Sequence, residues 1–131
     1  MADALKFEGL KHSYGGTVVL ALPDWSAGEG QHWLFLGPSG SGKTTLLNIL
    51  AGLLTPSAGT VSVVGQELAS LSSSARDSLR GRQVGIVFQK LHLIAALTVM
   101  ENLVLVQTLA ERMADSQEAY ELLERLGISD K

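Results

Sequence analysis

The sequence contains no cysteine, only three prolines and no apolar run long enough to cross a bilayer. Without cysteine the chain can form neither disulfides nor thiolate metal sites, so a disulfide scaffold is excluded. A membrane-spanning helix needs about 20 mostly apolar residues. The most apolar long stretch, residues 91–110, is interrupted by polar side chains such as Glu101 and Gln107. The polar N-terminal segment is not typical of a secretory signal. We therefore expect any membrane role to depend on a partner.

The charge of the chain gives no reason to expect a nucleic-acid partner. Its net charge is −3 at pH 7, whereas nucleic-acid-binding domains are usually basic. A composition of 46% hydrophobic and 18% charged residues is ordinary for a globular protein. The length of 131 residues corresponds to one domain with a single core.

Strand signals dominate the first third of the sequence and recur later. Loose alternation and a Gly15-Gly16 turn predict short strands between residues 4 and 35. The continuous apolar runs HWLFL (32–36) and VGIVFQ (84–89) are typical of strands that are buried on both faces of a parallel sheet. GTVSVVG (59–65), which lies between glycines, predicts one further strand.

Four helices are predicted from apolar spacing and from capping signals. The first follows the glycine-rich stretch after residue 36 and should end near Gly52 to Pro56. The other three begin with a capping residue that is followed three residues later by an acidic one. These pairs are Ser74 with Asp77, Thr98 with Glu101, and Asp115 with Glu118. The last helix has Gly127 as its stop. Its predicted apolar face consists of Ala119, Leu122, Leu123 and Leu126.

The stretch GPSGSGKTT, residues 37–45, fits the phosphate-binding pattern G-x-x-x-x-G-K-[ST]. A phosphate chain needs several backbone N–H groups that point inward together, and glycines allow a loop to curl that tightly. The predicted helix that follows would present unpaired amides and a positive dipole end to the anion. A glycine-rich structural turn is the alternative interpretation. The apolar run before the loop and the amphipathic helix after it favour a nucleoside triphosphate site.

The polar residues of this loop have separate predicted roles. Lys43 supplies a positive charge for the β and γ phosphates, and the Thr44 hydroxyl can ligate Mg²⁺. The loop alone does not choose among kinases, GTPases and transport ATPases. The GTPase motifs D-x-x-G and N-K-x-D do not occur in the sequence.

Four segments outside the phosphate-binding loop, before and after it, narrow the choice of family. They are FEGLKHSYGG, the PSAGT segment at 56–60, VGIVFQ and LTVMENL. With them, residues 5–126 resemble the ATP-binding subunits of ABC transporters. The resemblance implies an α/β fold: part of a P-loop NTPase core with an N-terminal antiparallel β subdomain and the start of a helical subdomain. Within one domain over residues 1–131, it assigns 1–90 to the β subdomain and core, and 91–131 to the helical part.

The resemblance also assigns roles to individual residues. Tyr14 matches the aromatic residue that stacks on adenine, the alternative being a strand tyrosine that packs on the core. Gln89 matches the glutamine that contacts Mg²⁺ and the attacking water and senses the membrane subunit, the alternative being a polar residue at a strand end. Thr45 would reach the α phosphate. Lys43 and Gln89 are thus the catalytic candidates, and Thr44 and Gln89 the metal candidates. The nucleotide-binding candidates are Tyr14, Gly37, Ser39, Gly40, Ser41, Gly42, Lys43, Thr44 and Thr45.

Three motifs of this family do not occur in the sequence: an LSGGQ-type signature, an apolar strand that ends in Asp-Glu, and the switch histidine. We therefore expect an N-terminal fragment that binds ATP and Mg²⁺ but is inactive on its own. Because the strand with Asp-Glu would share its sheet, we also expect the fragment to self-associate. The implied partners are a transmembrane permease and a second ATP-binding subunit, at the cytoplasmic face of the membrane.

Two other functions stay open. A different P-loop enzyme, such as a small-molecule kinase, would need an arginine-rich lid, for which Arg76, Arg80 and Arg82 are a poor substitute. A non-catalytic fragment that binds ATP or a membrane subunit is the second. Within the ABC family, the order VGIVFQ then LTVMENL is most similar to the branch of lipoprotein-release and macrolide or haem export ATPases. A proline often precedes LTV in that branch, whereas residues 94–96 are Ile-Ala-Ala here.

Overall fold

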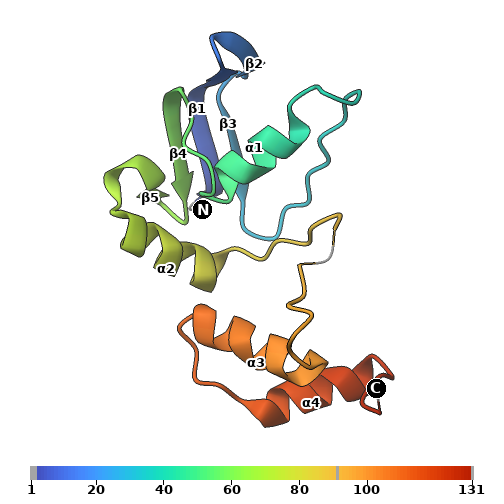
Figure 1. Cartoon of the computed structure of the whole chain (residues 1–131). Coiled ribbons are helices and arrows are strands. Elements are labelled where there is room, and N and C mark those ends of the chain that lie inside the picture. The colour runs from blue at the N-terminus through green and yellow to red at the C-terminus, as the bar shows by residue number, and fades with distance from the viewer. Residues whose placement is uncertain (1–2, 91, 131) are drawn as a thin grey trace. The chain divides into compact units, whose positions relative to one another are not determined.

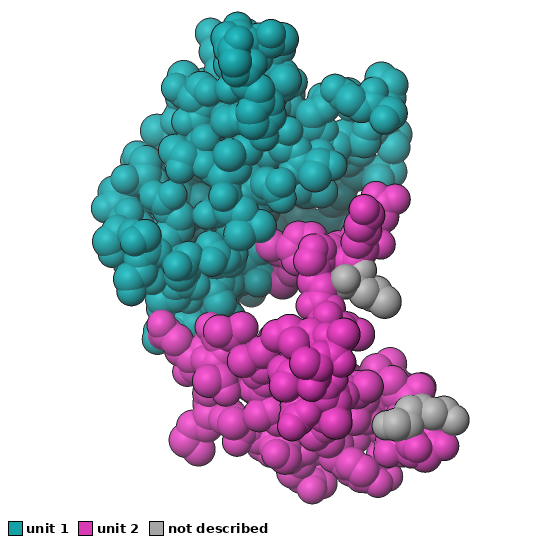
Figure 2. Space-filling model, in the orientation of Figure 1, with its two compact units in different colours: residues 1–84 teal, residues 85–131 magenta. Residues whose placement is uncertain are grey.

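The computed structural model describes residues 3–90 and 92–130 of the chain. The chain forms two compact units, residues 1–84 and residues 85–131 (Figure 2). The first unit contains a β-sheet with helices α1 and α2, and the second contains helices α3 and α4 (Figure 1). None of the described helices is both long and apolar enough to cross a membrane.

The sheet of the first unit is antiparallel and is built around one long strand, β1 (Asp3–Tyr14). β1 pairs with β2 (Thr17–Ala21), with β3 (Trp25–Gly28) and with β4 (Ala58–Val63). The short strand β5 (Gln66–Glu67) pairs with β4. Gly15 and Gly16 have φ angles of 55° and 83°, which allow the tight turn between β1 and β2. The predicted antiparallel β subdomain and the strand after Gly59 are therefore present.

A bulge near Gly9 decides which side chains of β1 face the core. Gly9 has a φ of 57°, and the pairing with β4 shifts register between Glu8 and Lys11. Phe7 before the bulge and Leu10 after it are both buried. Strand β4 approaches so closely here that a Cβ on Gly59 would lie 2.4 Å from the Gly9 carbonyl oxygen. Only glycine fits at residue 59.

Helix α1 (Lys43–Leu50) covers the sheet and supplies a large part of the core. Its buried residues are Leu46, Ile49 and Leu50. They pack with side chains from β1, β2, β4, the short 3₁₀ helix η1 (Leu68–Ser70) and α2 (Ser73–Gln83). The buried members of this cluster are Phe7, Leu10, Leu20, Leu46, Ile49, Leu50, Val61, Val63, Leu68 and Leu79. Burial of each large apolar side chain stabilises the fold by roughly 1.5–3 kcal/mol.

The helix caps follow the sequence signals with one correction. The hydroxyl of Ser72, not that of Ser74, accepts the capping hydrogen bond of α2, from the Ala75 N–H at 3.2 Å. Ser74 lies inside the first turn instead. A run of three serines offers three possible caps, and the hydroxyl chosen is the one whose backbone is still extended.

The two helices of the second unit begin where the capping signals place them. Thr98 and Glu101 form the reciprocal capping box of α3 (Val99–Leu109). Asp115 accepts hydrogen bonds from the Gln117 and Glu118 N–H groups and caps α4 (Ser116–Arg125). The predicted apolar face of α4 is correct at Ala119 and Leu123, which are buried, but Leu122 and Leu126 are exposed. Among the described residues of this unit, α4 packs mainly against α3. One neighbouring helix covers a narrower stripe of α4 than the predicted apolar face.

The two predicted parallel strands are absent from the described structure. Residues 32–36 and 84–89 have no strand conformation, Leu34 and Leu36 are exposed by 78% and 83%, and Val87 is fully exposed. Phe35 alone in the first run packs against the core. The physical reason is that a central strand needs hydrogen-bonded neighbours on both sides, and no described strand pairs with either segment.

Candidate nucleotide site

The loop at residues 37–42 leads directly into helix α1. Gly42 is the N-cap residue and has a left-handed conformation, with φ 88° and ψ 8°, and Gly40 has a φ of 79°. Residues with a Cβ rarely adopt such angles, so these two glycines allow the loop to fold back on itself. The first N–H groups of a helix have no partner within the helix, and its dipole is positive at this end. The loop therefore ends at a position that favours an anion.

The ammonium group of Lys43 lies inside this loop. Its Nζ atom donates to the carbonyl oxygens of Gly37 and Pro38, at 2.6 and 2.7 Å, and to the Ser41 hydroxyl at 3.3 Å. The loop is closed by a further hydrogen bond, from the Ser41 N–H to the Pro38 carbonyl at 3.2 Å. None of the ion pairs formed by the described residues involves Lys43. Its positive charge is held in place, and no carboxylate of the described residues neutralises it.

A concave site of about 330 Å³ opens beside Lys43. Its polar lining consists of residues that the sequence pattern predicts to bind nucleotide. The lining residues are Ser39, Gly40, Gly42, Lys43, Thr44, Thr45 and Val19. Thr44 is exposed, and Thr45 is half-buried. Hydrogen bonds from Lys43 connect Gly37 and Ser41 to this group. Gly37 and Ser41 also lie close together, because a Cβ on Gly37 would lie 2.6 Å from the Ser41 Oγ atom. The structure thus brings all of the predicted loop residues together.

Strand β2 supports the loop from behind, which the sequence pattern did not reveal. A Cβ on Gly42 would lie 2.7 Å from Leu20 Cδ2 and 2.9 Å from the Val19 carbonyl oxygen. The backbone of the loop therefore touches the hairpin formed by β1 and β2. The apolar run TVVLAL signals only a strand, because nothing local in it indicates which loop it will contact.

Tyr14 lies at the end of β1, immediately before the hairpin turn. Its side chain is 52% exposed, and its ring contacts the His12 ring edge-on, with centroids 4.6 Å apart and planes at 80°. Tyr14 does not line the cavity beside Lys43, which Val19 reaches from the opposite strand of the same hairpin. An exposed ring on the hairpin that touches the loop is compatible with base stacking, and the role stays a prediction.

Gln89 belongs to the second unit, so its predicted approach to Thr44 and Mg²⁺ stays a prediction. Its side chain is exposed and lies in a bend, not at a strand end as the sequence pattern predicts. Across the described residues, no group of three or more His, Cys, Asp or Glu could hold a metal ion. Mg²⁺ prefers oxygen ligands and usually binds proteins through few side chains together with phosphates. The Thr44 hydroxyl beside the phosphate loop fits that mode of binding.

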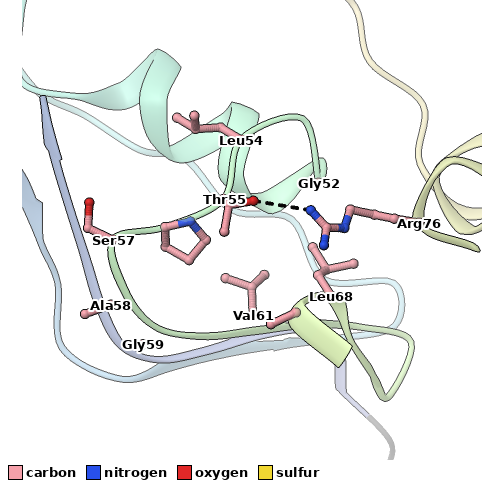
Figure 3. Close-up of a pocket in the computed structure, with 11 residues that line it drawn as sticks. Gly52, Leu54, Thr55, Ser57, Ala58, Gly59, Val61, Leu68 and Arg76 are labelled. Carbon is pink, nitrogen blue, oxygen red and sulfur yellow. Dashed lines mark hydrogen bonds between the residues drawn. The ribbon is translucent and has the colours of Figure 1, made fainter. Parts of the chain in front are cut away.

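A second cavity in the first unit has a different character. It measures about 160 Å³ and lies between the end of α1, strand β4 and helix α2. Arg76 donates from Nη1 to the Thr55 hydroxyl at 3.3 Å, as Figure 3 shows, and its side-chain carbons lie against Gly52. Most of the lining is apolar, with Leu54, Val61 and Leu68 among it. Its lining contains no lysine and none of the residues of the phosphate-binding pattern.

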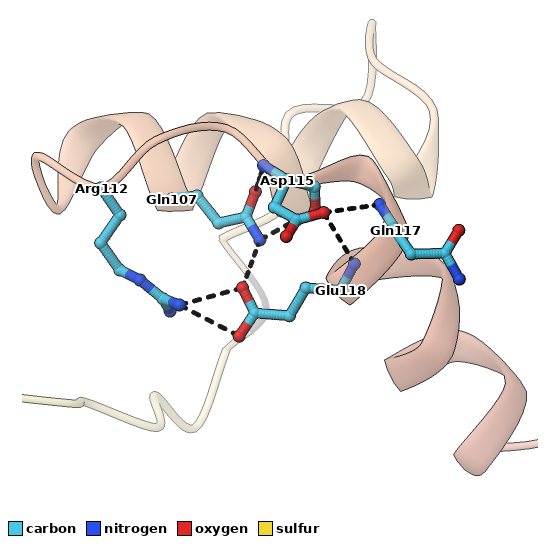
Figure 4. Close-up of polar contacts among 5 residues, drawn as sticks. All are labelled: Gln107, Arg112, Asp115, Gln117 and Glu118. Carbon is cyan, nitrogen blue, oxygen red and sulfur yellow. Dashed lines mark hydrogen bonds and ion pairs between the residues drawn. The ribbon is translucent and has the colours of Figure 1, made fainter.

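The polar side chains of the second unit hold its two helices together (Figure 4). Gln107 on α3 donates to the Asp115 carbonyl at 3.1 Å and accepts from the Asp115 N–H at 2.8 Å. Glu118 accepts from Gln107 at 2.9 Å and pairs with Arg112 at 3.0 Å. Because these groups satisfy one another, the cluster is structural.

A protein-family model described as "ABC transporter" matches residues 22–131. The chain belongs to the ABC transporter family. Among the curated relatives of this ABC transporter chain is the lipoprotein-releasing system ATP-binding protein LolD 1 of Rhodopseudomonas palustris. It is 41% identical over 98% of this chain and 61% of the relative. LolD of Chromohalobacter salexigens is 40% identical over 95% of this chain and 55% of the relative. The chain thus spans about three fifths of the length of these relatives.

Solved structures of ABC cassettes share the fold of the chain. A dimeric structure of the ATP-binding cassette MJ0796, in a post-hydrolysis state bound to ADP and Pi, superposes with a TM-score of 0.78 and 32% sequence identity. The match covers 88% of this ABC transporter chain and 51% of the cassette. The predicted α/β cassette fold is therefore confirmed, although two of its expected parallel strands are not formed. The family assignment also sets aside a small-molecule kinase.

Proposed function

We propose that this chain is part of the ATP-binding subunit of an ABC transporter and that residues 37–45 bind the phosphate chain of ATP. The observation that carries the proposal is the position of Lys43. Its charge is fixed inside the loop by two carbonyl groups, next to a helix N-terminus. Charge-assisted hydrogen bonds from ammonium to phosphate are about twice as strong as neutral ones.

Each loop residue then has a physical task in binding. The glycines direct backbone N–H groups toward the phosphates, and Lys43 offsets the charge of the β and γ groups. The Thr44 hydroxyl would hold Mg²⁺, which when bound neutralises charge on the phosphate oxygens. Tyr14 would stack on the base, and Thr45 would bind the α phosphate. Phosphoryl transfer depends mainly on such positioning and charge stabilisation.

The partners in this proposal follow from the relatives. Their names place LolD in a lipoprotein-releasing system, and the MJ0796 cassette is described as dimeric. We propose that the whole subunit pairs with a second ATP-binding subunit and drives a permease at the cytoplasmic face of the membrane. Binding and hydrolysis of MgATP would be coupled to transport by that permease.

Titration of the 131-residue chain with MgATP tests the phosphate site. We expect Lys43→Ala to lower ATP affinity by about ten- to a hundredfold, because a bond to a charged group contributes roughly 1.5–3 kcal/mol. Lys11→Ala is the matched control, since Lys11 is an exposed lysine on β1 that does not line the site. Identical titration curves for Lys43→Ala and the unchanged chain would exclude the loop as the binding site.

A further inference from the structure

One buried imidazole in the first unit lacks the hydrogen bonds that usually accompany burial. His12 is only 6% exposed, and neither its Nδ1 nor its Nε2 atom has a hydrogen-bond partner among the described residues. An unpaired buried polar group costs stability, so an apolar residue would suit this place better on grounds of folding alone. The one ring that His12 contacts in the described structure belongs to Tyr14. The presence of an imidazole here therefore needs a reason other than packing in the core.

His12 lies midway between the core and the exposed Tyr14. Leu10, His12 and Tyr14 are alternate residues of β1, and their exposure rises from 0% to 6% to 52%. His12 also pairs in register with Leu20 on β2. Directly opposed residues of an antiparallel pair have Cβ atoms about 4.5–5.5 Å apart and point to the same face. Leu20 is the side chain that would meet a Cβ on Gly42. A continuous series of contacts therefore joins Gly42 through Leu20 and His12 to Tyr14.

We propose that His12 is a positioning residue for the nucleotide base, a role that rests on the proposed function. Its ring packs edge-on against Tyr14 and holds that ring in one orientation while leaving about half of the side chain exposed for a base. An anchor ring whose rotamer is already fixed loses less side-chain entropy when a ligand binds. Because the contacts extend to Gly42, the same residue sets the ring relative to the phosphate loop. His12 thus favours ligands that carry a base over inorganic polyphosphate.

The test compares the affinities of the 131-residue chain for MgATP and for the magnesium complex of inorganic triphosphate. The informative variants are His12→Leu and His12→Phe. Both remove the unpaired nitrogens and fill the buried site, but only phenylalanine keeps a ring against Tyr14. We expect His12→Leu to weaken ATP about three- to tenfold, a part of the stacking contribution of a base, while triphosphate is unaffected. His12→Phe should restore the affinity for ATP.

Two further variants separate this effect from stability and from the phosphate site. Val63→Ala makes a cavity at a buried position of β4 and should change the two affinities in the same proportion. Tyr14→Ala should weaken ATP at least as much as His12→Leu does, again without affecting triphosphate.

Equal losses for both ligands in His12→Leu, or no loss for either, would overturn the positioning role. It would also be overturned if Tyr14→Ala showed no preference between the ligands. In these cases a strong effect of Lys43→Ala on both ligands would leave the phosphate site intact. If Lys43→Ala changed neither affinity, the proposed function itself would fail.

Discussion

Replacing Gly42 by alanine tests the contact between the phosphate loop and the hairpin, with Gly40→Ala as its matched control. Both glycines have left-handed backbone angles, with φ of 88° and 79°. The backbone cost of a Cβ at such angles, roughly 1–2 kcal/mol, is therefore nearly the same at the two positions. They differ in their surroundings, because a Cβ on Gly40 would meet nothing within 4 Å.

The alanine at residue 42 would meet β2 at close range. Its Cβ would lie 2.7 Å from Leu20 Cδ2 and 2.9 Å from the Val19 carbonyl oxygen, a backbone atom that cannot move by rotating a side chain. Overpacking of this kind typically costs 1–3 kcal/mol. We therefore expect a loss of roughly 1–2 kcal/mol in the free energy of unfolding for Gly40→Ala and roughly 2–5 kcal/mol for Gly42→Ala.

Urea titration monitored by tryptophan fluorescence measures this difference. Trp25 and Trp33 are the two tryptophans of the chain. Their rings contact each other within the first unit, with centroids 5.2 Å apart. The signal therefore reports the unfolding of the unit that contains the loop. Equal midpoints and slopes for the two variants would refute the close packing of the loop on β2. The series of contacts from Gly42 to Tyr14 would lose its first step as well.

Three further predictions concern acid stability, turnover and association. The Thr98 N–H and hydroxyl lower the pKa of Glu101 below its ordinary value of 4.5. The Glu101 carboxylate should therefore stabilise α3 fully above pH 4.5, and this contribution should disappear as the pH falls through the lowered pKa. Amide hydrogen exchange in α3 measures the loss, which should be absent in Glu101→Gln. We expect no ATP hydrolysis above background from the 131-residue chain with Mg²⁺, and phosphate release that Lys43→Ala abolishes would contradict this. We also expect self-association that light scattering detects and that Leu36→Lys reduces, since Leu36 is one of the most exposed apolar residues. A monomer at high concentration would contradict that expectation.

The parts of the fold that the sequence predicts correctly are those decided by neighbouring residues. The phosphate loop depends on glycines at fixed spacing and on the helix that follows them. The capping box of Thr98 and Glu101 is closed within four residues. The hairpin turn depends on two glycines with positive φ. Each of these signals carries its own physical cause, so no distant contact is needed to interpret it.

The parts that could not be predicted depend on distant residues. The runs at 32–36 and 84–89 have the composition of buried strands, but a strand forms only where other strands pair with it. The support of Gly42 by Leu20 and the contact of His12 with Tyr14 likewise arise from the register of the hairpin. Asp77 singles out Ser74 as the cap in the sequence, but Ser72 caps the helix because its backbone is still extended.

The hydrogen bonds of Gln107 to Asp115 have a consequence for how the second unit responds to salt. The amide side chain of Gln107 accepts from the Asp115 N–H and donates to the Asp115 carbonyl, in the way that one strand pairs with another. Both partners in these two bonds are uncharged amide groups, so dissolved ions do not screen them. The neighbouring pair of Arg112 and Glu118 is exposed and weakens as ionic strength rises. The hydrogen bonds between Gln107 and Asp115 should therefore keep α3 connected to the start of α4 in concentrated salt, where the ion pair contributes least.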